Sequence, residues 1–268
     1  MVSVKKDEGV PCIDCISKER GSHGDAWRNV HDSYFSDRDV ARPFLDEVMA
    51  TFNTIRPDVI ADIGGGTGFI LHELSIREGV RGARLLNVDA SQEQLEACRG
   101  LECKCSSVMD IERRDLAREG ESLTIISRSV LHYFGREGQP SFLRKLRSIL
   151  RPGEMFVHQP ACFATPELRS CMNEIYPLMG VDKCYSTPRE LEGIHQQAGF
   201  EVLRSRPGPP LDLRSEDLAV RYGLGPETVE ELVKVIRRYG LDRDGVFDVG
   251  PGRFRTAFTY QLLTLRAR

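Results

Sequence analysis

The sequence predicts an α/β protein in which short buried strands alternate with amphipathic helices. The apolar run Val59–Ile63 ends in a cluster of glycines and continues into a helical pattern that begins at Phe69. A second apolar run, Leu85–Asp89, ends in a carboxylate. A clearly bounded helix follows later: Thr187 caps it, and Gly199 ends it just before another strand-like run. Strands and helices that alternate in this way are typical of an open, mostly parallel sheet covered by helices.

The glycine-rich turn has the sequence D-I-G-G-G-T-G from Asp62 to Gly68. A strand, a glycine turn and a helix N-terminus in succession form a place where a small cofactor can lie against bare backbone. A dinucleotide fingerprint would need a glycine where Phe69 stands, and a P-loop would need Gly-Lys-Ser/Thr, which is absent. The D-x-G-x-G-x-G pattern resembles motif I of the class I S-adenosylmethionine (SAM)-dependent methyltransferases.

The resemblance extends over residues 55–160. Asp89 stands where the family has a carboxylate that binds the ribose hydroxyls of SAM, since a carboxylate can accept two hydrogen bonds from a diol. Asp110 and Ile111 resemble the ending of the third strand, which reads the adenine amino group. Residues 123–134 resemble the fourth strand and its turn, and residues 142–157 resemble the next helix, the Pro-Gly turn and the fifth strand.

The resemblance implies a doubly wound, Rossmann-like sheet of seven mostly parallel strands in the order 3-2-1-4-5-7-6, with strand seven antiparallel. It implies SAM as cofactor and S-adenosylhomocysteine (SAH) as product. The implied cofactor-binding residues are Asp62, Gly64, Gly66, Gly68, Asp89, Asp110, Ile111, Ser127 and Tyr34. Simpler roles remain open: Asp62 as a turn former, Asp89 as a helix cap and Asp110 as an ordinary loop acid. Ser127 departs from the family pattern, because many members carry an acid or Asn there.

The chain divides into four parts. We expect an N-terminal lid and lead-in helix (1–54), a SAM-binding α/β core (55–206), a helical insertion (207–253) and a final core strand (254–268). In the lid, four ring side chains have the spacing of one helix face: Trp27, His31, Tyr34 and Phe35. We expect this face to pack on the core, to close over the cofactor, or to do both. The insertion contains two helical patterns and forms either a cap over the substrate or an oligomer contact.

Candidate catalytic residues follow the fourth and fifth strands. His132, Tyr133 and His158 stand where an open α/β sheet places its ligand crevice. A neutral imidazole suits the removal of a proton from an acceptor, although packing is an equally open role for both histidines. The two histidines could also hold a divalent metal, with His31 or Cys162 as a third ligand, but a metal is possible rather than predicted.

The composition argues against several classes of protein: nucleic-acid-binding, membrane-spanning and secreted proteins. The formal charge of −3 disfavours a nucleic-acid partner, and no apolar run is long enough to span a membrane. The N-terminus lacks the apolar core of a signal peptide, so we expect a cytoplasmic protein. Eight cysteines include one C-x-x-C, Cys12 and Cys15, which alone is a weak zinc signal.

The sequence therefore predicts a SAM-dependent methyltransferase that acts on an oxygen, nitrogen or carbon atom of a small molecule, and a homodimer is possible. Three alternatives remain open: a tRNA or protein methyltransferase, a thiol-dependent arsenite-type methyltransferase, and a SAM-binding module without catalysis.

Overall fold

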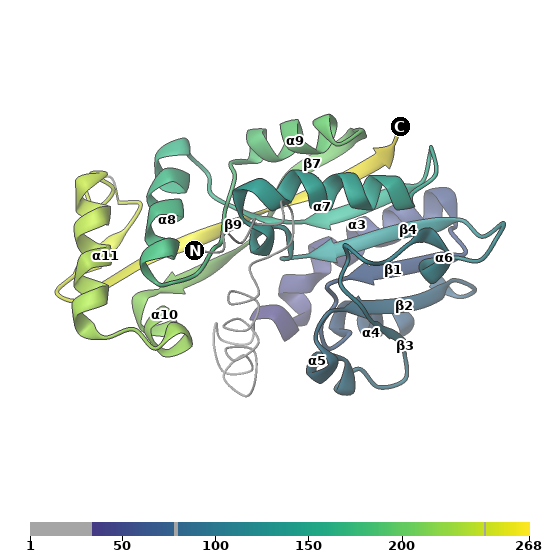
Figure 1. The fold of residues 1–268 in the computed structure, drawn as a ribbon, viewed down its shortest axis with the longest axis horizontal. Coiled ribbons are helices and arrows are strands. Elements are labelled where there is room, and N and C mark those ends of the chain that lie inside the picture. Colours follow the sequence, from purple (N-terminus) through teal and green to yellow (C-terminus); the bar gives the residue numbers. More distant parts are fainter. Residues whose placement is uncertain (1–33, 78–79, 244) are drawn as a thin grey trace, which may run out of the picture.

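The computed structural model describes residues 34–77, 80–243 and 245–268. A twisted central sheet is covered by helices on both faces, and a long hairpin extends from one end of it (Figure 1). The predicted lid residues Trp27 and His31, together with Cys12 and Cys15, lie outside the described residues.

The sheet is built around five parallel strands. In chain order the strands are β1 (Val59–Ile63), β2 (Arg84–Asp89), β3 (Glu102–Cys105), β4 (Leu123–Arg128), β5 (Met155–Gln159), β6 (Ala161–Cys162), β7 (Phe200–Arg214), β8 (Asp248–Gly250) and β9 (Arg253–Ala267). The order is β3-β2-β1-β4-β5-β9, and β7 also pairs with β9. The predicted strand six corresponds to β7 and the predicted strand seven to β9, so this order agrees with the predicted order 3-2-1-4-5-7-6. As predicted for strand seven, β9 is antiparallel to its neighbours β5 and β7. The short strands β6 and β8 were not predicted.

Helices occupy the segments between the strands. Their bounds are η1 (Tyr34–Ser36), α3 (Arg38–Ile55), α4 (Phe69–Ser75), α5 (Gln92–Glu96), α6 (Arg113–Leu116), η3 (Leu131–Phe134), α7 (Gly135–Ile149), α8 (Pro166–Leu178), α9 (Pro188–Gln197), α10 (Ser215–Tyr222) and α11 (Pro226–Arg238). The predicted capping box of α9 is present: the Thr187 hydroxyl accepts from Glu190 N at 3.3 Å, and the Glu190 carboxylate accepts from Thr187 N at 2.8 Å. Gly199 follows the helix with φ of 94°, a left-handed conformation that glycine adopts without strain.

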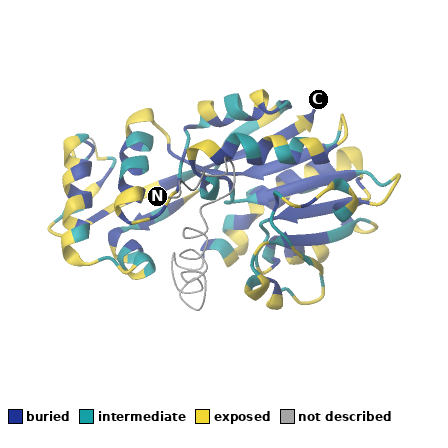
Figure 2. Cartoon of the chain, in the orientation of Figure 1, coloured by how far each residue is buried: buried dark blue, intermediate teal, exposed yellow. Residues whose placement is uncertain are grey.

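Two apolar clusters sandwich the sheet. On one face, α7 and α9 pack against β1, β4, β5 and β9; on the other face, α3 and α4 cover the same strands. Every residue of β1 and of β5 is buried, as expected for strands covered on both sides. Figure 2 shows the strands buried along most of their length and the exposed residues on the outer sides of the helices.

The hairpin of β7 and β9 extends beyond the sheet and carries the insertion. Its register runs from Phe200 opposite Ala267 to Arg214 opposite Arg255. Helices α8, α10 and α11 pack around its far end in a third apolar cluster (Figure 1). The expected boundary at 206/207 thus falls inside a strand, while the two helical patterns of the insertion are found as α10 and α11.

A buried carboxylate ties α3 to this hairpin. Glu47 is 2% exposed and accepts hydrogen bonds from Arg204, at 2.7 Å, and from Arg206, at 3.1 Å. The hydroxyl of Thr264, on β9, also bonds to it. A carboxylate in this position needs such partners, because an unpaired buried charge is strongly destabilising.

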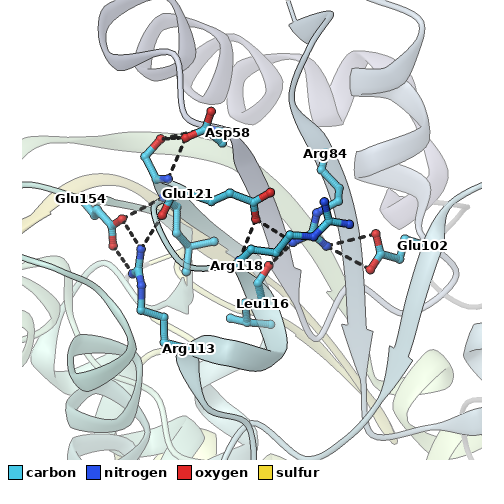
Figure 3. Close-up of polar contacts among 10 residues, drawn as sticks. Asp58, Arg84, Glu102, Arg113, Leu116, Arg118, Glu121 and Glu154 are labelled. Carbon is cyan, nitrogen blue, oxygen red and sulfur yellow. Dashed lines mark hydrogen bonds and ion pairs between the residues drawn. The ribbon is translucent and has the colours of Figure 1, made fainter.

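Ion pairs fasten the amino ends of the parallel strands (Figure 3). Arg113 binds Glu154 through two contacts, at 2.6 and 2.8 Å. Arg84, the first residue of β2, contacts Glu102 and Glu121. Charge pairs thus link the amino ends of the strands. In an open α/β sheet, a ligand is expected at the opposite, carboxyl ends.

None of the described helices is long and apolar enough to cross a membrane.

Candidate active site

A cavity of about 480 Å³ opens at the carboxyl ends of β1, β2 and β4. Residues 62–67 form its floor, together with residues 88–91 after β2 and residues 106–110 after β3. Residues 128–130, 133–134 and 181–183 form its second wall, and Val130 of this wall lies against Gly64. The cavity therefore lies at the crevice where open α/β sheets bind their ligands.

The glycine turn on the cavity floor has little room for side chains. Gly64 and Gly66 have φ angles of 74° and 56°, in the left-handed region. Gly65 is restricted by its neighbours: a Cβ atom there would lie 2.1 Å from Asn87 Oδ1 and 2.7 Å from Asp62 Oδ2. The turn thus presents bare backbone to the cavity and needs glycine on both conformational and steric grounds.

Asp89 holds this turn in place. One of its carboxylate oxygens accepts from Gly66 N and the other from Ser91 N, each at 2.8 Å. Asn87 adds a bond from its amide to Gly66 O at 2.9 Å. Each carboxylate oxygen has the capacity for a further hydrogen bond, so Asp89 can order the turn and also accept from a ligand in the cavity.

Asp62 and Arg128 place two buried, opposite charges at the cavity. Asp62 is 1% exposed, and its Oδ1 has no hydrogen-bond partner. Burial, reinforced by the charge of Asp89 and opposed by Arg128, raises the pKa of Asp62 to about 7. Arg128 donates from Nη1 to Phe35 O at 3.1 Å, and its guanidinium lies 5.6 Å from the ring centroids of Tyr34 and Phe35. Its buried Nε and Nη2 have no hydrogen-bond partner. Buried polar atoms are rarely left without such partners, so both groups are candidates to bind the charged groups of a ligand.

Several predicted cofactor residues lie beside the cavity rather than on it. Ser127 donates to Ile63 O at 2.8 Å and thereby joins β4 to β1. Ile111 is part of the apolar core, and Gly68 precedes α4. Tyr34 stacks on Tyr260 and donates to Pro209 O at 2.6 Å, while its neighbour Phe35 lines the cavity. Asp110, by contrast, lines the cavity and is exposed.

Neither predicted histidine reaches the cavity. His158 is fully buried, and its Nδ1 lies 3.0 Å from Nε2 of His195. His195 Nδ1 must carry a hydrogen, because it faces the carbonyl oxygen of Leu191 at 2.6 Å. Its Nε2 therefore accepts from His158. His132 is 5% exposed and stacks on Tyr185 with ring centroids 5.0 Å apart. Among the described residues that line the cavity, none is a histidine.

The second wall carries residues that sequence reasoning missed. Tyr133 was predicted and lines the cavity, but Arg128, Asp182 and Lys183 were not singled out. Arg128 directly follows Ser127, so reading the strand one residue further would have found it. Lys183 lies in the irregular segment between α8 and α9, which has no periodic pattern to reveal it. In the part of the chain that the structure describes, no group of three potential metal ligands occurs.

Comparisons with known proteins agree with this geometry. The sequence model of a methyltransferase-domain family matches residues 60–153. A search of curated proteins finds no match. Among solved structures, the YcgJ protein of Bacillus subtilis is 13% identical with a TM-score of 0.64, covering 85% of this chain and 99% of its own. A putative methyltransferase of Bacillus halodurans is 15% identical with a TM-score of 0.64, covering 83% and 97%.

A third similar structure holds ligands. The 1,6-didemethyltoxoflavin-N1-methyltransferase of Burkholderia thailandensis, solved with 1,6-didemethyltoxoflavin and SAH, is 16% identical with a TM-score of 0.56. The alignment covers 98% of this chain and 93% of that chain. These likenesses show a shared fold.

Proposed function

We propose that this chain is a class I SAM-dependent methyltransferase and that it transfers the methyl group of SAM to a small-molecule acceptor bound in the same cavity; the methyltransferase-domain model that matches residues 60–153 and the shared fold support this. The cofactor, when bound, supplies an electrophilic methyl group on a sulfonium sulfur. The protein's task is to hold an acceptor atom in line with that methyl group in a site from which water is excluded.

The residues present fit the cofactor at both of its ends. On the floor, Asp89 and the bare backbone of the glycine turn suit a ribose and its nucleoside. At the other end, the unpaired Oδ1 of Asp62 and the unpaired Nε and Nη2 of Arg128 match the ammonium and carboxylate of an amino acid. This pair of buried opposite charges beside the glycine turn is the observation that carries the proposal.

Small molecules are the acceptors that this cavity suits best. Its volume of about 480 Å³ lies within the range of small-molecule sites, roughly 300–1,000 Å³, and it has to hold the cofactor as well as the acceptor. The formal net charge of −3 disfavours a nucleic acid. A general base is needed only when the acceptor atom arrives protonated. Tyr133, Asp182 and Lys183 are the titratable side chains of the second wall, and none of the described residues that line the cavity is a histidine.

The amino-acid end of the cofactor provides a sharp test. SAH and 5′-methylthioadenosine share the adenosine part, but only SAH has the amino and carboxylate groups. We expect Arg128→Met to weaken SAH binding at least tenfold in calorimetry and to leave methylthioadenosine binding unchanged. Arg144→Met, on the exposed side of α7, is the matched control. Equal SAH affinity in wild type and Arg128→Met would contradict the assigned charge pair.

Turnover decides the acceptor class. Wild-type protein with SAM should form SAH in the presence of a small-molecule extract, and should form none with tRNA or with protein freed of small molecules. Methyl transfer to either macromolecule would overturn the proposal. Binding of SAH without turnover on any acceptor would favour a SAM-binding module that lacks catalysis.

A further inference from the structure

The second wall of the cavity holds a lysine among tyrosine rings. Lys183 lines the cavity and is 4% exposed. Its ammonium lies 4.6 Å from the ring centroid of Tyr133, 5.5 Å from that of Tyr222 and 5.8 Å from that of Tyr176. Its Nζ also donates to the Tyr222 hydroxyl at 2.8 Å. Cation–π contacts and this hydrogen bond fix the position of the ammonium of a residue that lines the cavity.

A second cation supports this wall from α10. Arg221 donates from Nη2 to the Tyr133 hydroxyl at 3.5 Å, and its guanidinium lies 5.3 Å from the ring centroid of Tyr222. Lys183 and Arg221 therefore share the same two tyrosines. Because Tyr133 accepts from a cation, its own O–H becomes a stronger donor toward an anion in the cavity.

The acidic residue on this wall lies beside the start of a helix. Asp182 lines the cavity next to Lys183, but its carboxylate lies against the first residue of α7. A Cβ atom on Gly135 would be 3.2 Å from each carboxylate oxygen of Asp182. The partial positive charge of a helix N-terminus stabilises an anion there. Asp62, Asp89 and Asp110 line the cavity with Arg128 close to Asp62, and Lys183 is the cation that lines it beside Tyr133.

We propose that the methyl acceptor is a small organic acid whose anionic oxygen is held by Lys183 and Tyr133. This inference rests on the proposed function and names its substrate class. A carboxylate, a phenolate and an enolate all present the required oxygen anion. Lys183 serves as a binding and positioning residue, with Arg221 acting on the acceptor through Tyr133.

The charges of the transfer step favour such an acceptor. A lone pair of the anionic oxygen forms the new O–CH₃ bond, and the bond between carbon and sulfur breaks with its electron pair going to sulfur. A cation and an anion thereby become a neutral thioether and a neutral ester or ether, and no proton needs to be removed during the step. Because a nearby cation favours the ionised form of an acid, Lys183 also keeps the acceptor in its reactive state. The lack of a histidine among the described lining residues then needs no substitute base.

The test measures charge preference directly. Calorimetry of the full-length protein, with and without saturating SAH, would use a panel of organic acids with one to three rings, each paired with its neutral amide or methyl ether. We expect the acids as a group to bind wild type at least tenfold more tightly than their neutral partners. Lys183→Met should abolish that preference and Lys183→Arg should keep most of it, while both variants should bind SAH as wild type does.

Lys234→Met, at an exposed position on α11, is the control for loss of a positive charge, and it should bind the panel as wild type does. Wild type that binds SAH but shows no preference for the acids would overturn this inference and leave the proposed function standing. An unchanged preference in Lys183→Met would also overturn it. Failure of SAH to bind wild type would overturn the proposed function and the inference together.

Discussion

The buried histidine pair makes the stability of this protein sensitive to acid. His195 has its Nδ1 hydrogen directed at the Leu191 carbonyl, and its Nε2 accepts from His158. A proton added to Nε2 of His195 would point at the Nδ1–H of His158. Two hydrogen-bond donors would then face each other across the 3.0 Å that now separates a donor from an acceptor. It would also place a charge in the core, where Phe156 and Phe200 pack around both rings. Burial accordingly lowers the pKa of His195 from 6.5 to about 4.

The sign of the effect follows from which state binds more protons. Between pH 6.5 and pH 4 the unfolded chain protonates His195 and the folded chain does not, so stability is lost as the pH falls through this window. At about 1.4 kcal/mol per pKa unit, the loss amounts to about 3 kcal/mol at pH 4. Burial also lowers the pKa of His158, which acts in the same direction.

The raised pKa of Asp62, about 7, acts in the opposite direction over much of the same range. The informative quantity is therefore the difference between wild type and His195→Gln, measured by urea unfolding from pH 7.5 to pH 4.5. Gln keeps an acceptor for His158 but does not titrate. We expect the variant to be less stable at neutral pH and the gap to shrink by about 2–3 kcal/mol toward pH 4.5. A gap that stays constant across this range would refute the reasoning.

Three further predictions concern the cofactor turn, the α3 contact and the charge pair. Gly65→Ala should weaken SAH binding at least tenfold, because its Cβ would overlap Asn87. At Gly193 an added Cβ meets only open space, so Gly193→Ala should leave SAH affinity unchanged. Equal SAH affinities of the two variants would contradict this geometry. Glu47→Ala should lower the free energy of unfolding by about 2 kcal/mol in urea titrations, because it leaves buried polar groups without their partner. Asp46→Ala, at an exposed position, should lower it by under ~0.5 kcal/mol. Similar losses in the two variants would contradict the role given to the buried Glu47 carboxylate. SAH affinity should fall about tenfold from pH 8 to pH 6 as Asp62, with a pKa of about 7, becomes protonated, and Asp62→Asn should lose this pH dependence.

The parts of the fold that could be predicted are those governed by strong local rules. The glycine turn after β1 is recognisable because left-handed φ angles and a close Asn87 exclude other residues. Helix α9 is recognisable because its capping box and its terminal glycine leave little choice of boundary. The full length of strand β7 was harder to predict, since Pro207, Pro209 and Pro210 argue against a strand. These prolines are tolerated because the described part of β7 pairs only with β9 and has one unpaired edge.

The candidate site was harder to predict because neighbouring residues of a strand face opposite sides. Ser127 pairs in register with His158, and both lie within the core. The next residue, Arg128, reaches the cavity instead. A shift of one residue along a strand thus exchanges a core position for a ligand position. Lys183 depends on contacts with residues far away in the chain, such as Tyr133 and Tyr222, which no local pattern reveals.

The measurement that tests the central claim most directly is a calorimetric titration of SAH into wild type and Asp89→Ala. Glu96→Ala, at an exposed position of α5 that is not among the described lining residues, controls for the loss of a carboxylate near this turn. We expect micromolar binding to wild type and to Glu96→Ala, and a loss of at least fiftyfold in Asp89→Ala with a far-ultraviolet circular dichroism spectrum like that of wild type. No SAH binding to wild type, or undiminished binding to a folded Asp89→Ala, would contradict the assignment of this cavity as the cofactor site.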